Sequence, residues 1–342
     1  MTHSRRSVLR RGAGLAAAGT AAALAGCSGG ANGGGTDGFD SGYAAFFTLN
    51  DWANEVAGDR ASFEDPVDVG QLGHGWTPDG TLAADVAATD AFVYLDNPEF
   101  SWAQDLAATL EADYDTVSVI DGLDGLEDDL LEWNHSHGSE EPAHEEGGHD
   151  GGGDHSGEEG GEEGRHDPHV WVDPVFAADI VDTIAAGLGE ADPDNAGEYA
   201  DNAAAYGEEL EAVDAAFRSI ADEGSRDVAV MAGHNSFQYL EARYGFRLHS
   251  PVGVSPQNEP TQTEIADTIE IVNEEGIDAV LYDHFQSPRL AESIVENSDA
   301  TEAVPVTPAG GTTREWNEAG YGYLEQMTEI NVPAFERAFG AQ

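Results

Sequence analysis

The sequence predicts an α/β protein with two lobes, each containing a four-stranded, mainly parallel sheet flanked by helices. In both halves of the 342-residue chain, short apolar runs alternate with stretches of helical period, a pattern typical of βα units. A long helical pattern with one apolar stripe separates the halves and predicts a helix that joins them. The length also fits two lobes, at roughly 100–200 residues per domain.

The first half contains four strand candidates with three helical stretches between them. A helix between two strands returns the chain to the start of the sheet, so the strands pair in parallel. The strands are expected at 43–48, 62–69, 91–95 and 116–120, and the helices near 50–57, 82–88 and 102–112.

Residues 134–166 interrupt this pattern. The segment consists mainly of Gly, Asp, Glu and His without apolar periodicity, which predicts a disordered insertion. We interpret it as a low-affinity metal-collecting loop, and acidic filler with incidental histidines is the alternative. Its candidate ligands are His135, His137, His144, His149, His155 and His166.

Two helices are expected after the insertion, at 174–187 and 192–223. Asp192 suits the N-cap of the longer helix and Pro193 suits its first turn. Apolar residues recur along it at helical intervals, which indicates one buried stripe. The stripe consists of Tyr199, Tyr206, Leu210, Val213 and Phe217.

The βα alternation restarts after the long helix. Residues 43–191 are therefore expected to form an N-terminal lobe and residues 224–342 a C-terminal lobe. In the second lobe the strands are expected at 227–232, 246–250, 279–282 and 303–306, and the helices near 237–244, 261–275, 289–296 and 321–339.

The first 27 residues have the features of an export signal. Arg5 and Arg6 precede an apolar run at 12–25, which is too short to span a membrane. The pair resembles a twin-arginine signal, and Leu-Ala-Gly-Cys at its end resembles a lipobox. We expect export, lipidation of Cys27, and anchoring at the outer face of the cytoplasmic membrane through a flexible tether at 28–42.

The composition excludes several classes of function. The chain has 67 Asp and Glu against 13 basic residues, all of them Arg, and a formal net charge of −54. A nucleic-acid-binding protein needs a basic surface, so no nucleic acid partner is expected. The single Cys excludes a disulfide scaffold and a thiolate zinc site.

An acidic surface without Lys is typical of proteins from halophiles. At 1 M salt the Debye length is about 3 Å, which screens the repulsion between carboxylates. We therefore interpret the charge as salt adaptation, and a surface that gathers cations is the alternative.

Three isolated histidines are the candidate metal ligands. His74 and His169 follow strands or the insertion in the first half, and His234 directly follows the first strand of the second half. Ligands of open parallel sheets bind beyond the carboxyl ends of the strands, so the lobes are expected to place these side chains across one cleft. A lone loop histidine usually has only a structural role. Three imidazoles with an oxygen would make a tetrahedral zinc site, and imidazole suits zinc better than manganese.

The chain resembles the zinc-specific branch of the metal-binding solute-binding proteins of ABC transporters, over nearly all of the expected mature chain. The most specific motif is Asp-Pro-His-Val-Trp at 167–171. The supporting motifs are Ala-Phe-Phe-Thr-Leu at 45–49, Val-Ala-Gly-Asp-Arg at 56–60, His-Gly-Trp-Thr-Pro at 74–78, Asp192-Pro193 with Tyr199 and Asn202, His234 with Phe237 and Tyr239, and Ser-Pro-Arg-Leu-Ala at 287–291.

The resemblance implies a rigid interlobe helix and a metal ion in the cleft, with its histidine ligands at His74, His169 and His234. Histidine at the third position favours zinc, because manganese binders of the family typically carry Glu there. It also implies a monomeric, non-enzymatic receptor that delivers its ion to an ABC permease and its ATPase. A His-rich acidic loop before the second ligand is typical of the zinc branch.

The fourth ligand departs from the family pattern. Many members supply an Asp near the end of the last strand, where this chain has Thr307. A neutral hydroxyl is a poor zinc ligand, so water or Asp283, which follows the seventh strand, is expected instead. His249 and His284 are expected to be structural.

Three other functions remain open at this point. A receptor of the same family for manganese or iron would use the same cleft. A zinc hydrolase or lyase would also use three histidines with an open position, but the sequence contains no HExxH motif. A surface metal buffer or adhesin is the third, since cell adhesion is associated with the family.

Overall fold

The computed structural model describes residues 39–132, 166–253 and 259–341. The chain divides into two units, Met1–Gly38 and Phe39–Gln342, and everything below concerns the second. The predicted signal, Cys27, most of the tether and all loop histidines except His166 lie outside the described residues. Among the helices that the structure describes, none combines the length and apolarity needed to cross a membrane.

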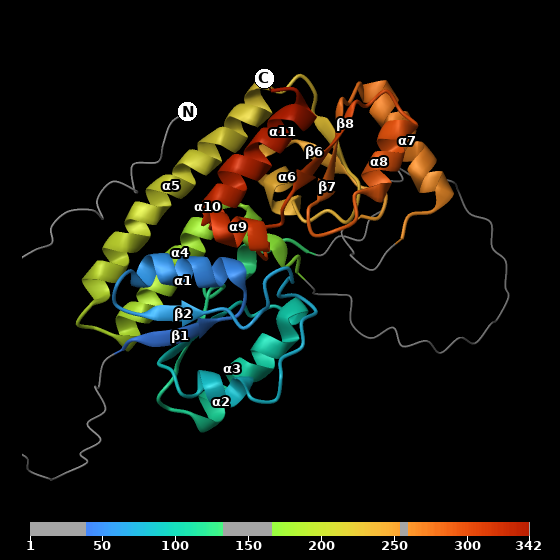
Figure 1. Cartoon of the computed structure of the whole chain (residues 1–342). Helices are drawn as coiled ribbons and strands as arrows, with labels where there is room; N and C mark the ends of the chain where they lie inside the picture. The colour runs from blue at the N-terminus through green and yellow to red at the C-terminus, as the bar shows by residue number, and fades with distance from the viewer. Residues whose placement is uncertain (1–38, 133–165, 254–258, 342) are drawn as a thin grey trace, which may run out of the picture. The chain divides into compact units, whose positions relative to one another are not determined.

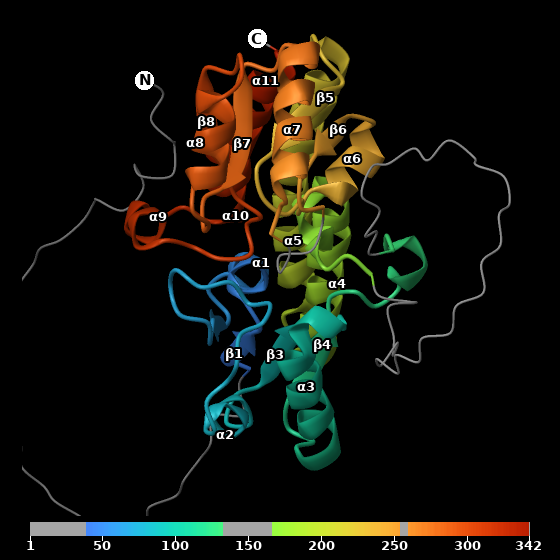
Figure 2. The same cartoon turned by 90° about the vertical axis from the view of Figure 1, so that its right-hand side faces the viewer.

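The first sheet contains four parallel strands in the order β2-β1-β3-β4. Figure 1 labels β1 and β2, and Figure 2 labels β1, β3 and β4. The neighbours are in register through pairs such as Gly42 with Ala91. Of the two central strands, β3 is mostly buried, and β1 alternates between buried and half-buried residues. The strands are β1 (Ser41–Ala44), β2 (Ser62–Glu64), β3 (Ala91–Tyr94) and β4 (Ser118–Asp121). The fold class is confirmed for this lobe.

All four strands of this sheet are shorter than the sequence predicts, and β1 and β2 differ most from the expected ranges. The expected strand at 43–48 was wrong at both ends, because β1 begins at Ser41, inside the expected tether, and helix α1 (Phe47–Ala57) begins three residues after Ala44. The expected strand at 62–69 ends at Glu64, since Pro66 has no N–H for the sheet ladder.

Helices cover both faces of the first sheet. Helix α1 and helix α4 (Pro174–Ala191) lie on one face, and α2 (Leu82–Val86) and α3 (Ser101–Asp113) lie on the other (Figures 1 and 2). The face of α4 against β4 requires a glycine at position 187, because a Cβ there would approach Ile120 to 2.8 Å. The sheet is therefore buried on both faces, as parallel sheets usually are.

The long helix α5 (Ala196–Glu223) connects the lobes. It packs on α1 and α4 of the first lobe and on three helices of the second. The five stripe residues predicted from the sequence are all buried. The expected start at Asp192 was wrong: Asp192 ends α4, and its carboxylate accepts hydrogen bonds from the side chains of Tyr199 and Asn195.

The second sheet repeats the strand order of the first, β6-β5-β7-β8, with all neighbours parallel. Two of its helices end or begin at capping residues that satisfy free backbone groups. Gly245, in the αL conformation, ends α6, and a capping box of Thr261 and Glu264 begins α7. The strands are β5 (Val228–Met231), β6 (Arg247–His249), β7 (Ala279–Asp283) and β8 (Glu302–Val306), and the helices are α6 (Gln238–Tyr244), α7 (Gln262–Glu275) and α8 (Arg289–Glu296).

The C-terminal helix expected at 321–339 is not one regular helix. The structure has α9 (Arg314–Ala319), which the sequence did not predict, then α10 (Tyr323–Glu325), a π-helical turn at Gln326–Asn331 and α11 (Val332–Phe339). The π turn presents Gln326 and Asn331 to Thr307, with which both form buried hydrogen bonds. Such turns mark places where a helix is adapted to a local contact.

An ion pair links the lobes beside α5. Arg243 of α6 donates to the carboxylate of Asp173, which also caps α4 through the N–H of Val175. The Arg243 guanidinium lies 5.2 Å from the centre of the Phe176 ring. Asp173 is 1% exposed, and burial raises its pKa against the opposing effect of Arg243.

Replacing Arg243 with Met is expected to lower the free energy of unfolding by about 2–4 kcal/mol, because it leaves a buried carboxylate without its charge partner. Urea unfolding measures this loss. The matched control is Arg218→Met, which breaks the exposed ion pair with Asp214 within α5 and should cost less than about 1 kcal/mol. Equal losses in the two variants would contradict the role assigned to Arg243.

Candidate metal centre

His74 lies on the long loop between β2 and α2. The residue before it must be glycine, because a Cβ at Gly73 would lie 2.6 Å from Cβ of Phe46. The indole N–H of Trp102 donates to the Gly73 carbonyl at 3.2 Å. This close packing places His74 near the carboxyl end of β1, where Phe46 follows the strand.

His169 begins a 3₁₀ turn, His169–Val172, that precedes α4. Asp167 organises the turn: its Oδ1 accepts from the His169 N–H at 3.0 Å and lies 2.7 Å from His169 Nδ1. A carboxylate on one ring nitrogen orients an imidazole and selects the other nitrogen, Nε2, as the metal donor.

Three hydrogen bonds also join this turn and the residues just before it to the second lobe. The Tyr239 hydroxyl donates to the carbonyl of Asp167 at 2.9 Å, and the Tyr323 hydroxyl donates to the carbonyl of Trp171 at 2.6 Å. The Trp171 indole donates in return to the carbonyl of Pro308 at 2.7 Å. The position of His169 therefore depends on both lobes.

His234 follows β5 directly, as the sequence predicted. Gly233 has a φ of 150°, which a residue with a side chain rarely adopts, and its carbonyl accepts from the Ser250 hydroxyl at 2.6 Å. The His234 Nε2 atom lies 2.7 Å from the hydroxyl of Ser236. The imidazole of His234 is thus in contact with its own loop.

The three predicted histidines converge where the lobes meet. The ring centroids of His74 and His169 are 6.0 Å apart, and those of His169 and His234 are 5.7 Å apart. His169 and His234 are each 3% exposed. The donor atoms do not form a finished coordination sphere: within residues 39–132, 166–253 and 259–341, no three His, Cys, Asp or Glu side chains are grouped so as to hold a metal ion.

Burial keeps two of these imidazoles neutral. It lowers the pKa of His74 to about 4, helped by the neighbouring His169, and lowers the pKa of His234 to about 3, helped by His169 and His74. A proton on one ring disfavours a proton on the next, and desolvation disfavours any charged form. Neutral imidazole is the form that binds a metal.

Asp283, at the end of β7, lies close enough to His169 to be coupled to it electrostatically. It is 2% exposed, and its Oδ1 accepts from the N–H of Phe285 at 2.9 Å. Its Oδ2 is buried and has no hydrogen-bond partner in the described part of the chain. Burial raises the pKa of Asp283 to about 6, although the nearby His169 opposes the rise. A buried carboxylate oxygen of this kind can bind a cation.

Thr307 is not part of the group. Its hydroxyl donates to the side-chain oxygen of Gln326 at 2.9 Å and accepts from the N–H of Ala309. Ala309, two residues later, has a φ of 54°. Its carbonyl accepts a hydrogen bond from the Thr48 hydroxyl across the lobe boundary. This segment joins the lobes.

The other histidines have separate surroundings. His249 Nε2 lies 2.9 Å from the hydroxyl of Thr268, and His284 packs on Trp316 with ring centroids 4.5 Å apart. His166, the last residue of the predicted insertion, pairs with Glu132 in an antiparallel bridge. The described residues on either side of the insertion, Glu132 and His166, are therefore paired three residues before His169.

Two residues of the site were missed from the sequence, Asp167 and Ser236. Each lies two positions from a candidate ligand, a spacing that allows a side chain to reach the ring of its neighbour. Asp167 stood inside the most specific motif, so its position was a usable signal. Nothing in the local sequence singled out Ser236.

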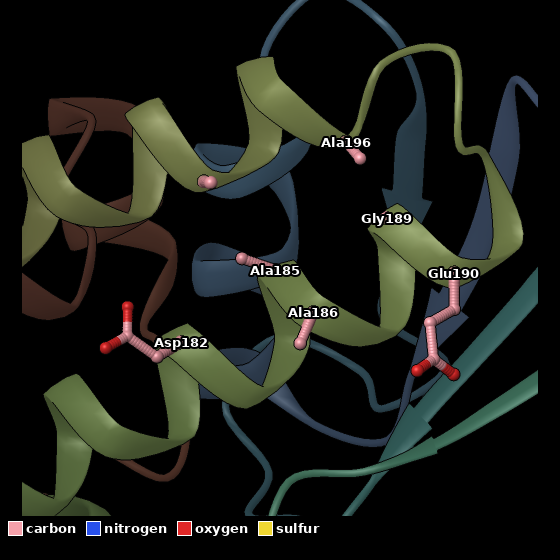
Figure 3. Close-up of a pocket in the computed structure, with 7 residues that line it drawn as sticks. Asp182, Ala185, Ala186, Gly189, Glu190 and Ala196 are labelled. Carbon is pink, nitrogen blue, oxygen red and sulfur yellow. The ribbon is translucent and has the colours of Figure 1, made fainter.

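A shallow groove between α4 and α5 is a separate feature (Figure 3). Alanine and glycine line most of it, with Asp182 and Glu190 as its charged side chains. It contains no histidine, so it offers no comparable metal site.

Comparisons with known proteins identify the family. The model described as "ZnuA: Zinc-uptake complex component A periplasmic" matches residues 43–338. Zinc-binding lipoprotein AdcA of Streptococcus pneumoniae is 29% identical over 296 residues, which are 85% of this chain and 54% of AdcA. The chain thus spans about half the length of that relative. The high-affinity zinc uptake system protein ZnuA of Bacillus subtilis is 26% identical over 285 residues, 83% of each protein.

Solved structures agree with this result. The Zn(II)-bound ZnuA-like domain of Streptococcus pneumoniae AdcA superposes with a TM-score of 0.69 at 26% identity, covering 88% of this chain and 99% of that domain. Its similarity confirms the two-lobed α/β fold, and the family match confirms the resemblance that the motifs indicated. The chain belongs to the ZnuA family of zinc-uptake solute-binding proteins, which are not enzymes.

Proposed function

We propose that the protein is an extracytoplasmic receptor that captures Zn²⁺ between its lobes and delivers it to an ABC permease for zinc uptake. The observation that carries the proposal is the convergence of three histidines, the half-buried His74 and the buried His169 and His234, at the lobe boundary. Membership of the zinc-uptake family and the relatives that bear zinc in their names support it.

The donor set supports zinc over manganese. Imidazoles are ligands that suit zinc, whereas manganese prefers carboxylate and water oxygen. The low pKa values of His74 and His234 mean that an ion has no proton to displace from them near neutral pH. The ion is the cargo of the protein, so binding must also be reversible.

Asp283 is our candidate for the fourth ligand. Its buried Oδ2 and its electrostatic coupling to His169 support this choice. A carboxylate would also offset one of the two charges of Zn²⁺ in a buried site. The finding that the Thr307 hydroxyl is engaged by Gln326 and Ala309 argues against Thr307 as a donor.

Several features outside the described residues belong to the same proposal. Residues 1–27 would direct twin-arginine export, Cys27 would carry the lipid anchor beside the permease and its ATPase, and 28–38 would tether the body. The histidines at 135, 137, 144, 149 and 155 would collect zinc loosely. The acidic surface would reflect adaptation to high salt rather than metal capture.

Alanine at His74, His169 or His234 is expected to weaken zinc binding by at least two orders of magnitude, because each removes one ligand from a small set. Chelator-competition titration measures the affinity, and elemental analysis after equilibration with equal zinc and manganese measures the preference. His249→Ala is the matched control, since His249 is partly buried and its ring contacts Thr268 rather than the three candidate ligands. Unchanged affinity in the three variants, or preferential retention of manganese by the wild type, would contradict the proposal.

Asparagine at Asp283 is expected to weaken zinc binding roughly 10- to 100-fold, because the amide keeps the shape of the side chain but not its charge. Asp51→Asn is the control, since Asp51 is also a buried carboxyl whose pKa is raised to about 6. Asp51 accepts from Tyr323 and Tyr206 instead of facing the histidines. If Asp283→Asn binds zinc like the wild type, water is the fourth ligand.

The pH dependence of zinc affinity is expected to differ between the wild type and Asp283→Asn. A carboxyl with a raised pKa of about 6 is protonated below that pH, and zinc must then displace the proton. His74 and His234, with pKa values of about 4 and 3, add nothing above pH 5. Between pH 6 and pH 5 the wild type should therefore lose roughly one decade more affinity than the variant. Isothermal titrations at both values test this, and parallel curves would exclude Asp283 as a proton-linked ligand.

A further inference from the structure

The two most buried histidines of the cleft are held by their loops in opposite ways. Asp167 lies against Nδ1 of His169, on the far side of the ring from Nε2. Ser236 instead lies 2.7 Å from Nε2 of His234. The first contact orients a ring for metal binding through Nε2, and the second occupies the corresponding nitrogen.

The contact with Ser236 is well sheltered from water. Ser236 is 2% exposed and His234 is 3% exposed. The Ser236 hydroxyl makes no second hydrogen bond in the described part of the chain. A buried hydroxyl with one partner keeps that partner, because losing it leaves a polar group unsatisfied. Whichever of the two atoms carries the shared proton, the bond occupies Nε2.

The loop around the pair is fixed as well. Asn235 donates through its N–H to the carbonyl of Gly253 at 2.8 Å, and its side chain contacts Glu241. Ser250 bonds to the carbonyl of Gly233. Because both flanking residues are held, movement of the imidazole or of the Ser236 hydroxyl is the available way to separate them.

We infer that Ser236 is an affinity-setting residue that occupies the Nε2 atom of His234 when no ion is bound and must be displaced when the ion binds. The inference rests on the proposed function, since it assumes that His234 is a ligand. Breaking the bond subtracts from the binding free energy and leaves the hydroxyl to find another partner. Ser236 therefore weakens capture and favours release of the ion, which a delivery receptor requires.

The contacts of Asp167 and Ser236 predict opposite changes in zinc affinity when each side chain is replaced, so the direction of the change tests the inference. Removing a group that orients a ligand weakens metal binding, whereas removing a group that competes with the metal strengthens it. Asp167→Asn is therefore expected to bind zinc more weakly than the wild type. Ser236→Ala is expected to bind zinc about three- to tenfold more tightly, the change that corresponds to one net hydrogen bond.

The experiment measures zinc affinity by chelator competition in the wild type, Ser236→Ala, Ser236→Thr and Asp167→Asn. Alanine is smaller than serine and fits the same space, and threonine restores the hydroxyl and should return the affinity to the wild-type value. Unchanged or weaker binding by Ser236→Ala would overturn the inference, and weaker binding would indicate that zinc uses Nδ1 with Ser236 as its support. The inference would also be overturned if Ser236→Thr bound zinc as tightly as Ser236→Ala.

A spectroscopic readout separates competition from a general change in packing. Long-range ¹H–¹⁵N spectra report each ring nitrogen of His234. The Nε2 resonance should differ between the wild type and Ser236→Ala without zinc and coincide when both are saturated with zinc. A difference that persists at saturation would overturn the inference. Failure of the proposed function is distinguishable, because it appears as unchanged zinc affinity in His234→Ala itself.

Discussion

The hydrogen bonds that fix the His169–Val172 turn between the two lobes are the interaction on which the candidate site depends. From the second lobe, Tyr323 donates to the carbonyl of Trp171 within the turn and Tyr239 donates to the carbonyl of Asp167 just before it, and Trp171 donates to Pro308. The turn is buried, so each of these polar groups would be unsatisfied without its partner. This arrangement brings His169 between His74 of one lobe and His234 of the other, and it also sets the spacing of their rings.

The net charge of the chain and the donor groups of the candidate metal centre are of different kinds. The chain has a formal net charge of −54, yet the candidate centre is formed mainly by imidazole side chains rather than by carboxylates. Burial keeps His74 and His234 uncharged and raises the pKa of Asp283. A site of this kind discriminates by the type of donor atom rather than by attraction of any cation, because surface charge is screened by salt while a buried donor set is not.

The repeated sheet topology explains why the site lies at the lobe boundary. Both sheets have the order 2-1-3-4, so each has a crevice beside its first strand where successive connections leave in opposite directions. His234 follows β5 and Asp283 ends β7, which are the strands that flank the crevice of the second sheet. Helix α5 contacts both lobes and limits how far these edges can separate.

The amino-acid sequence by itself determined the fold class, the two four-stranded sheets and the buried stripe of α5, and it singled out three histidines as candidate ligands. These predictions follow from local periodicity and from the rule that ligands gather at strand ends. Both can be applied to residues that are close together in the sequence. Only the tertiary structure decided the boundaries at Asp192 and Gln326, because the side chains of Tyr199, Asn331 and Thr307 reach those places from elsewhere. It alone also revealed the roles of Asp167, Ser236 and the free oxygen of Asp283, since a hydrogen bond, or its absence, depends on groups that burial brings together.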